Sequence, residues 1–172
     1  DAAAFSAPMF GIPAGPLPAL SATLAALMHR INKRVTTRGW FVPGQTHYQP
    51  KPFAGNDLTN CPQRYQWFRD LYQQYPAYQL GGVSWAWLDA ALQACKQIRQ
   101  DRDPQVPLLI LQAGADTVVD NHAQNVVASL HQIPLQTIPG ARHELLAGTD
   151  TERLEVYTRL NLWLQQHAAA DL

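Results

Sequence analysis

The feature of this sequence that most constrains its fold is a pair of short apolar segments, each followed by a residue that can hold or move a proton. Residues 108–111 form an unbroken apolar run that leads through small residues to Asp116. Residues 133–138 form a second short apolar run, which is followed by a Pro-Gly pair and then by His143. Such runs are typical of strands that are buried on both faces of a parallel sheet. We therefore expect an α/β fold whose strands deliver an acid and an imidazole to one edge, where open α/β sheets do their chemistry.

The acid and the histidine follow one another in the order of the last two members of the Ser–Asp–His triad in α/β-hydrolases. In that chemistry a neutral imidazole takes a hydroxyl proton and returns it to the leaving alcohol, while a carboxylate fixes the tautomer of the ring. A surface histidine without a role is the alternative, but the position at a strand end favours the catalytic interpretation of His143. Asp120 is a rival to Asp116, and we expect it instead to cap a helix that begins near Asn121.

The nucleophile of such a triad has no clear place in the sequence. Residues 82–86 imitate the G-x-S-x-G elbow around Ser84. A real elbow needs a buried strand before it and little bulk after it, whereas the preceding residues are few and polar, and Trp85 and Trp87 flank the serine. We expect Ser84 to be the N-cap of a helix, and it remains an alternative nucleophile. Ser6 lies in a predicted opening strand and is expected to be structural.

Composition excludes several classes of protein. The chain has 172 residues, 47% of them hydrophobic and 15% charged, as expected of one globular domain. Thirteen Lys and Arg balance thirteen Asp and Glu, so no net charge argues for a nucleic-acid partner. Cys61 and Cys95 fit neither a disulfide framework nor a zinc pattern, and we expect two thiols in a reducing, cytoplasmic compartment. No apolar run approaches the roughly 20 residues that span a bilayer.

Metal and cofactor chemistry are not expected. His143 and Glu144 begin like a zinc-protease motif, but Ala147 stands where the second histidine would have to be. The sequence also contains no glycine-rich phosphate loop. We therefore expect neither a metal ion nor a cofactor.

The pattern of apolar residues predicts alternating strands and helices after a long helical region. The expected elements are a strand at 2–8, helices at 17–31, about 62–75 and about 85–100, a strand at 106–112, a helix at 121–131, a strand at 134–138 and a helix at 151–167. In the last helix the predicted buried stripe contains Leu154, Tyr157, Leu160, Trp163 and Leu164.

Four stretches in order make the chain resemble the C-terminal portion of a serine hydrolase of the α/β-hydrolase fold. They are residues 6–11, residues 56–59 with 64–65, residues 80–87, and the pair 111–116 and 139–144. The resemblance is to the branch that contains bacterial L2-type lysophospholipases and monoacylglycerol lipases.

The resemblance implies a partial α/β-hydrolase fold, with parallel strands six to eight, flanking helices, and a mainly helical cap inserted after the first strand. It assigns residues 1–8 and 101–172 to the core and residues 9–100 to the cap. By position, Asp116 corresponds to the triad acid and His143 to the triad base. The nucleophile and the oxyanion loop would precede Asp1, so the chain departs from the family pattern by lacking both. The N-terminal half of the fold is then an expected partner, and the chain alone is expected to be inactive.

The function that the resemblance implies is that of a serine ester hydrolase acting on monoacyl lipids. The alternative is a truncated, non-catalytic module that binds lipid or a protein through the cap. Residues 2–56 contain no acid and five basic residues, and the apolar residues from Leu17 to Ile31 recur at helical spacing. The first interpretation of this apolar face is that it packs within the domain, and a peripheral contact with the inner membrane is the alternative.

Overall fold

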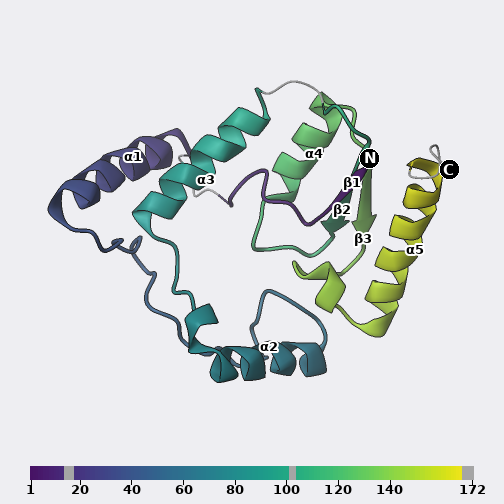
Figure 1. Cartoon of the computed structure of the whole chain (residues 1–172), viewed down its shortest axis with the longest axis horizontal. Coiled ribbons are helices and arrows are strands. Elements are labelled where there is room, and N and C mark those ends of the chain that lie inside the picture. The colour runs from purple at the N-terminus through teal and green to yellow at the C-terminus, as the bar shows by residue number, and fades with distance from the viewer. Residues whose placement is uncertain (14–17, 101–103, 168–172) are drawn as a thin grey trace.

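The computed structural model describes residues 1–13, 18–100 and 104–167. Within them, three parallel strands form one sheet in the order β1, β2, β3, with β1 at Ala3–Ser6, β2 at Leu108–Ala113 and β3 at Leu135–Ile138 (Figure 1). The register pairs Phe5 with Ile110, and Ile110 with Leu135. The expected α/β class with parallel strands is confirmed.

Helices occupy the two connections of the sheet and the segment after it. They are α1 Pro18–Val35, α2 Pro62–Gln74, α3 Trp85–Ile98, α4 Asn121–Leu130 and α5 Asp150–His167, with 3-10 turns η1 Pro76–Tyr78 and η2 Leu145–Ala147. The helices α1, α2 and α3 lie between β1 and β2 in the chain, and α4 lies between β2 and β3. Leu17, where the first helix was expected to begin, lies outside the described residues, as do 101–103 and 168–172 of the predicted core.

The central strand β2 is buried on both faces, which explains its unbroken apolar run. Leu109 and Leu111 pack with Val156 and Trp163 of α5 on one face. Ile110 points to the opposite face, where it packs with Ala123, Val127 and Ala128 of α4. Figure 1 shows α4 and α5 on the two sides of the sheet. The core therefore holds β2 rigidly up to its carboxyl end, where Asp116 follows.

The opening strand β1 lies at an edge of this sheet. The apolar residues at the start of the sequence are typical of a buried strand and predict burial, but Ala4, Phe5 and Ser6 are exposed, and Phe5 keeps 39% of its surface in contact with solvent. The prediction of burial was wrong because β1 is the edge strand of the described sheet and pairs only with β2. An edge strand presents unpaired backbone groups and can accept another strand.

The helices between β1 and β2 are less well covered. Helix α1 packs against α3, with Ala25 fully buried and Asn32 nearly so. Four of the long apolar side chains described in this helix lie on another face and are exposed: Leu24, Leu27, Ile31 and Val35. In Figure 1, α1 and α3 run side by side on the far side of α4 from α5, and α2 lies apart from them. None of the described helices is long and apolar enough to cross a membrane.

Candidate active site

Asp116 is placed by the end of β2. The strand ends at Ala113, and the backbone N–H of Gly114 donates to the carbonyl of Ile138 at 2.9 Å. A side chain at Gly114 would place its Cβ 2.9 Å from that carbonyl oxygen, so only glycine fits this approach of the two strand ends. The Oδ1 atom of Asp116 accepts hydrogen bonds from the backbone N–H groups of Val118 at 2.8 Å and Val119 at 3.1 Å. These bonds hold the carboxylate in one orientation.

His143 is placed by the end of β3. The strand stops at Ile138, and Gly140 turns the chain with a φ of 71°, in the left-handed region that favours glycine. The carbonyl of Ala141 then accepts a hydrogen bond from Ala115 N–H at 2.9 Å, which ties this turn to the loop of the acid. The two strand ends therefore deliver adjacent loops.

The structure brings the two predicted residues together. His143 Nδ1 lies 2.9 Å from Asp116 Oδ2; the carboxylate side chain is fully buried, and the imidazole is 21% exposed. A carboxylate can only accept, so Nδ1 carries the proton of the neutral ring and Nε2 carries its lone pair. Nε2 has no hydrogen-bond partner within the described part of the chain. An imidazole in this state can accept a proton through Nε2.

The two rival residues have structural tasks. Ser84 is the N-cap of α3, and its Oγ accepts from Trp87 N–H at 3.2 Å, as expected. Asp120 caps α4 by accepting from His122 N–H at 2.8 Å, also as expected. Neither side chain is hydrogen-bonded to His143 in the residues that the structure describes.

The two cysteines are free and buried. Burial raises the pKa of the Cys95 thiol, so this side chain is a poor nucleophile at neutral pH. The Cys61 thiol is held by the side chains of Gln63 and Arg64, each 3.3 Å away. No three His, Cys, Asp or Glu side chains in the described chain are grouped so that they could hold a metal ion.

The sequence did not reveal a role for the segment that leads into α2. Thr59 and Asn60 precede Pro62 and are residue types that commonly cap a helix, so the sequence predicts one of them as the cap of α2, but Cys61 is the N-cap and makes no side-chain cap bond. Thr59 and Asn60 instead donate to carbonyls of residues 139–148, the histidine loop. Thr59 donates to Ala147, and Asn60 donates to Gly140. The motif at residues 56–59 and 64–65 was the signal that could have pointed to this contact.

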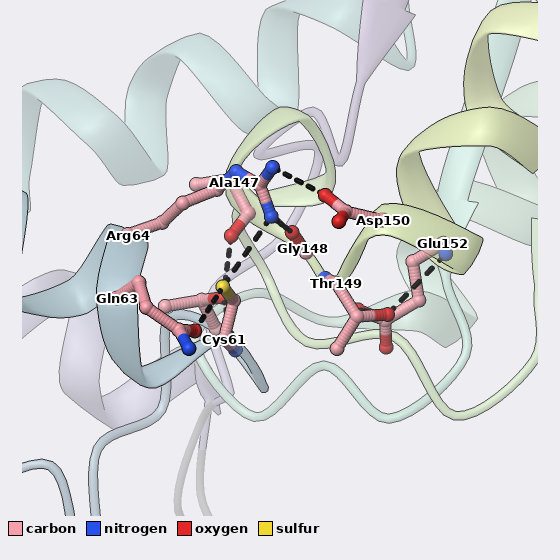
Figure 2. Close-up of polar contacts among 9 residues, drawn as sticks. Cys61, Gln63, Arg64, Ala147, Gly148, Thr149, Asp150 and Glu152 are labelled. Atoms are coloured by element: carbon pink, nitrogen blue, oxygen red, sulfur yellow. Dashed lines mark hydrogen bonds and ion pairs between the residues drawn. The ribbon is translucent and has the colours of Figure 1, made fainter.

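Helix α5 begins beside this segment. Thr149 and Glu152 form a capping box: Glu152 N–H donates to Thr149 Oγ1, and Thr149 N–H donates to Glu152 Oε2. Figure 2 shows Arg64 reaching from α2 to the carboxylate of Asp150. That hydrogen bond lowers the pKa of Asp150 and raises the pKa of Arg64.

A cavity of about 580 Å³ lies between α2 and the start of α5. Its lining residues are Cys61, Pro62, Gln63, Arg64, Trp67, Thr149 and Asp150. Neither Asp116 nor His143 lines it, so this cavity is not where the imidazole would act.

Parallel strands flanked by helices, with a buried acid hydrogen-bonded to a histidine at their carboxyl ends, define the α/β-hydrolase class. Residues 1–150 match the family model described as "Serine aminopeptidase, S33". The chain therefore belongs to this family of hydrolases.

Two relatives are lysophospholipases by name. The chain is 31% identical over 126 residues to "Probable lysophospholipase L2" of Haemophilus influenzae, an alignment that covers 72% of this chain and 40% of the relative. It is 31% identical over 163 residues to "Lysophospholipase L2" of Escherichia coli, covering 89% of this chain and 47% of that protein. The chain thus spans less than half the length of these relatives.

Two solved structures share the fold. The soluble variant of monoglyceride lipase from Saccharomyces cerevisiae, in complex with a substrate analog, matches with a TM-score of 0.64 at 17% identity, over 95% of this chain and 52% of that one. The monoacylglycerol lipase of Paleococcus ferrophilus matches with a TM-score of 0.63 at 17% identity, over 96% of this chain and 59% of that one. The family match and the two lysophospholipase relatives, together with this shared fold, confirm the relationship to hydrolases of the lysophospholipase and monoacylglycerol lipase type.

Proposed function

We propose that this chain supplies the acid and the base of a Ser–Asp–His triad in an ester hydrolase that acts on monoacyl lipids. Asp116 is the acid and His143 the base. The observation that carries the proposal is the 2.9 Å contact between His143 Nδ1 and Asp116 Oδ2, which leaves Nε2 as the proton acceptor.

In the proposed reaction a serine hydroxyl from outside these 172 residues attacks the acyl carbonyl of the substrate. His143 Nε2 takes the hydroxyl proton, and Asp116 stabilises the imidazolium. The tetrahedral intermediate then expels the alcohol, which takes the proton from His143 and leaves the acyl group on the serine. A water molecule, deprotonated by His143, attacks this acyl-serine; the intermediate then releases the fatty acid from the serine oxygen, which takes the proton back from His143.

The serine and the oxyanion donors would come from the N-terminal half of the same fold. Two observations support this part of the proposal. The named relatives are more than twice as long as the matched share, since the alignments cover 40% and 47% of them. In the described sheet the free edge of β1 is also open to a further strand, and Phe5 of β1 is exposed.

The monoacyl lipid as substrate rests on the names of the relatives and on the proposed division of the chain. Residues 1–8 and 101–172 would form the hydrolase core, and residues 9–100 the cap. The aromatic residues of the cap would line a channel for the acyl chain, since ligand pockets are mostly apolar. The family description names a peptidase, so an amide is the competing substrate class.

The test uses the complete protein that carries this chain, isolated from its source. We expect it to hydrolyse a monoacylglycerol and a lysophosphatidylcholine of the same acyl length, and to leave an aminoacyl anilide intact. His143→Gln and Asp116→Asn should each abolish nearly all ester hydrolysis. Cleavage of the anilide alone would refute the substrate class, and an unchanged rate in His143→Gln would refute the proposed base. Lipid binding without turnover would favour the non-catalytic alternative.

We further propose that α1 rests on an anionic membrane surface. Its exposed apolar residues share the helix with a set of basic residues: Arg30, Lys33 and Arg34. An amphipathic helix of this kind binds anionic lipid by burying its apolar side chains and by the attraction of its basic side chains to the lipid headgroups. We expect the protein to sediment with vesicles that contain phosphatidylglycerol, and not with pure phosphatidylcholine vesicles.

The matched variants for this contact are Leu27→Glu on α1 and Leu154→Glu on α5, because both leucines are exposed, at 53% and 68%. Leu27→Glu should weaken vesicle binding several-fold, and Leu154→Glu should leave it unchanged. Equal effects of the two variants, or binding that is indifferent to salt, would contradict the proposal.

A further inference from the structure

Residues 56–64, the brace segment, contact the histidine loop on both sides of His143. Before the histidine, Arg142 Nη1 donates to the carbonyl of Asn56. After it, Glu144 N–H donates to the carbonyl of Leu58 at 2.8 Å. The backbone of His143 is therefore held between two hydrogen bonds to a segment that lies more than eighty residues earlier in the chain.

Three further contacts extend this attachment along the loop. The hydroxyl of Thr59 donates to the carbonyl of Ala147 at 2.6 Å. Asn60 Nδ2 donates to the carbonyl of Gly140 at 2.9 Å. Figure 2 shows the third contact, in which Arg64 donates to the carbonyl of Gly148, also at 2.9 Å.

The brace segment also touches the loop of the acid. Thr117, the residue after Asp116, donates through its hydroxyl to Asp57 Oδ1 at 3.2 Å. One segment therefore contacts the neighbours of both members of the pair. A shift of this segment would change the position of one loop relative to the other.

The brace segment is stiff enough to transmit position. Asn56 is 5% exposed, and its Oδ1 accepts from the backbone N–H groups of Leu58 and Thr59, both at 2.9 Å. Thr59 is 1% exposed, and its Oγ1 accepts from Cys61 N–H at 2.9 Å while donating to Ala147. Buried and fully paired polar groups of this kind fix one conformation.

We infer that the brace segment is the positioning element of the catalytic pair: it sets the orientation of the His143 imidazole toward Asp116, with Thr59 and Asp57 as its positioning side chains. This inference rests on the proposed function for its effect on rate. The predicted effect on the hydrogen bond between Asp116 and His143 is independent of the proposed function, because that hydrogen bond can be observed separately. Through the brace segment, the part of the chain between β1 and β2 controls the chemistry at the strand ends.

The test compares Thr59→Val, Thr59→Ser and Thr46→Val in the complete protein. Valine removes the hydroxyl and keeps the shape, and serine keeps the hydroxyl. Thr46 is the matched control, because its hydroxyl also donates to a backbone carbonyl, that of His47, but on an exposed loop away from the brace segment.

Two readouts are measured on each variant. The first is the low-field proton resonance of His143 Nδ1–H, which reports its hydrogen bond to Asp116. The second is kcat and KM on a monoacylglycerol. Thr59→Val should broaden or remove the resonance and lower kcat about 10- to 100-fold, with KM within about twofold, since small misplacements of catalytic groups have effects of this size. Thr59→Ser should restore most of both readouts, and Thr46→Val should change neither.

A resonance and a kcat that survive Thr59→Val would overturn the inference, and so would a loss of thermal stability with the resonance intact. If Thr59→Val does not fold, Asp57→Ala decides, because Asp57 is exposed and its removal spares the core. Asp57→Ala should weaken the resonance, and Asp57→Asn, which keeps an acceptor for Thr117, should preserve it. If the wild-type protein hydrolyses no ester while the resonance responds as expected, the proposed function fails and the inference stands.

Discussion

The region from β2 to α5 and helix α1 make opposite use of apolar residues. In the first region Leu109, Ile110 and Ile138 are completely buried between helices on both faces of the sheet. In α1, Leu27 and Val35 keep 53% and 66% of their surface exposed. Both regions have the apolar spacing of their element type, so the spacing shows that a face is apolar and not what covers it.

The difference matters for function because the segment between β1 and β2, to which α1 belongs, reaches the candidate site through a different stretch, residues 56–64. The buried region fixes the ends of β2 and β3, and with them Asp116 and His143. The segment between β1 and β2 contributes residues 56–64, which contact both loops. The buried sheet edge and the brace segment therefore both contact the loops that carry one hydrogen bond.

The largest expected effect is on kcat, and it differs between a residue at the strand ends and a residue of the helical segment. His143→Ala should lower kcat for ester hydrolysis by about 10⁴- to 10⁶-fold, because it removes the proton acceptor. Ser84→Ala should leave kcat within a few-fold and cost about 1 kcal/mol of stability, because it removes only the cap of α3. Steady-state kinetics and urea unfolding of both variants measure the contrast. A loss of kcat in Ser84→Ala as large as that in His143→Ala would show that Ser84, in the helical segment, is the nucleophile.

The next effect concerns stability. Ile138→Ala creates a cavity in the packed core of the sheet and should lower the free energy of unfolding by about 3 kcal/mol. Leu27→Ala removes an exposed side chain and should change it by about 0.5 kcal/mol or less. Urea unfolding at pH 7 tests the pair. Similar losses in the two variants would show that α1 is covered in the complete protein.

The smallest effect is a pH dependence of the contact between α1 and α3. His29 Nδ1 lies 2.9 Å from Asp89 Oδ2, and this hydrogen bond lowers the pKa of Asp89. A lowered pKa means that the stabilisation is complete above the ordinary aspartate pKa of about 3.9 and is lost as the pH falls through the lowered value. Hydrogen exchange of α1 amides, corrected for intrinsic rates, should therefore lose protection below about pH 4.

The control for this effect is the core. Amides of β2 should keep their protection over the same pH range, because no ion pair holds them. Asp89→Asn should reduce the protection of α1 at pH 7 and remove its pH dependence. An α1 protection that is constant down to pH 3 in the wild type would contradict the assignment of this contact.

The strands, the helices and the Asp116–His143 contact could be predicted because their signals are local. Each apolar run is followed by small or turn-forming residues and then by the polar residue, so the chain itself marks where the strand ends. The parallel pairing then brings these ends together.

Faces of helices were harder to predict. In α5, Leu154 and Tyr157 were expected to be buried but are 68% and 41% exposed, whereas Val156 is fully buried. Leu160 and Trp163 fit a stripe with Leu154 and Tyr157 as well as a stripe with Val156. The packing of α5 on the sheet buries the stripe with Val156. The phase of an amphipathic helix is thus set by its partner and not by the spacing alone.

The brace segment could not be predicted as such. Its contacts join side chains of residues 56–64 to backbone carbonyls of residues 140–148, and a carbonyl leaves no mark on the sequence. The residues of the segment looked like a helix cap, which is the commoner task of Thr and Asn before a Pro. Its role depends on two segments meeting in space.

The central claim is that Asp116 and His143 serve a serine from outside these residues, and it is tested most directly by fluorophosphonate labelling with peptide mapping of the protein from its source. We predict the label on a serine that is absent from the 172 residues, with labelling lost in His143→Ala. Label on Ser84, or labelling that does not depend on His143, would contradict the account.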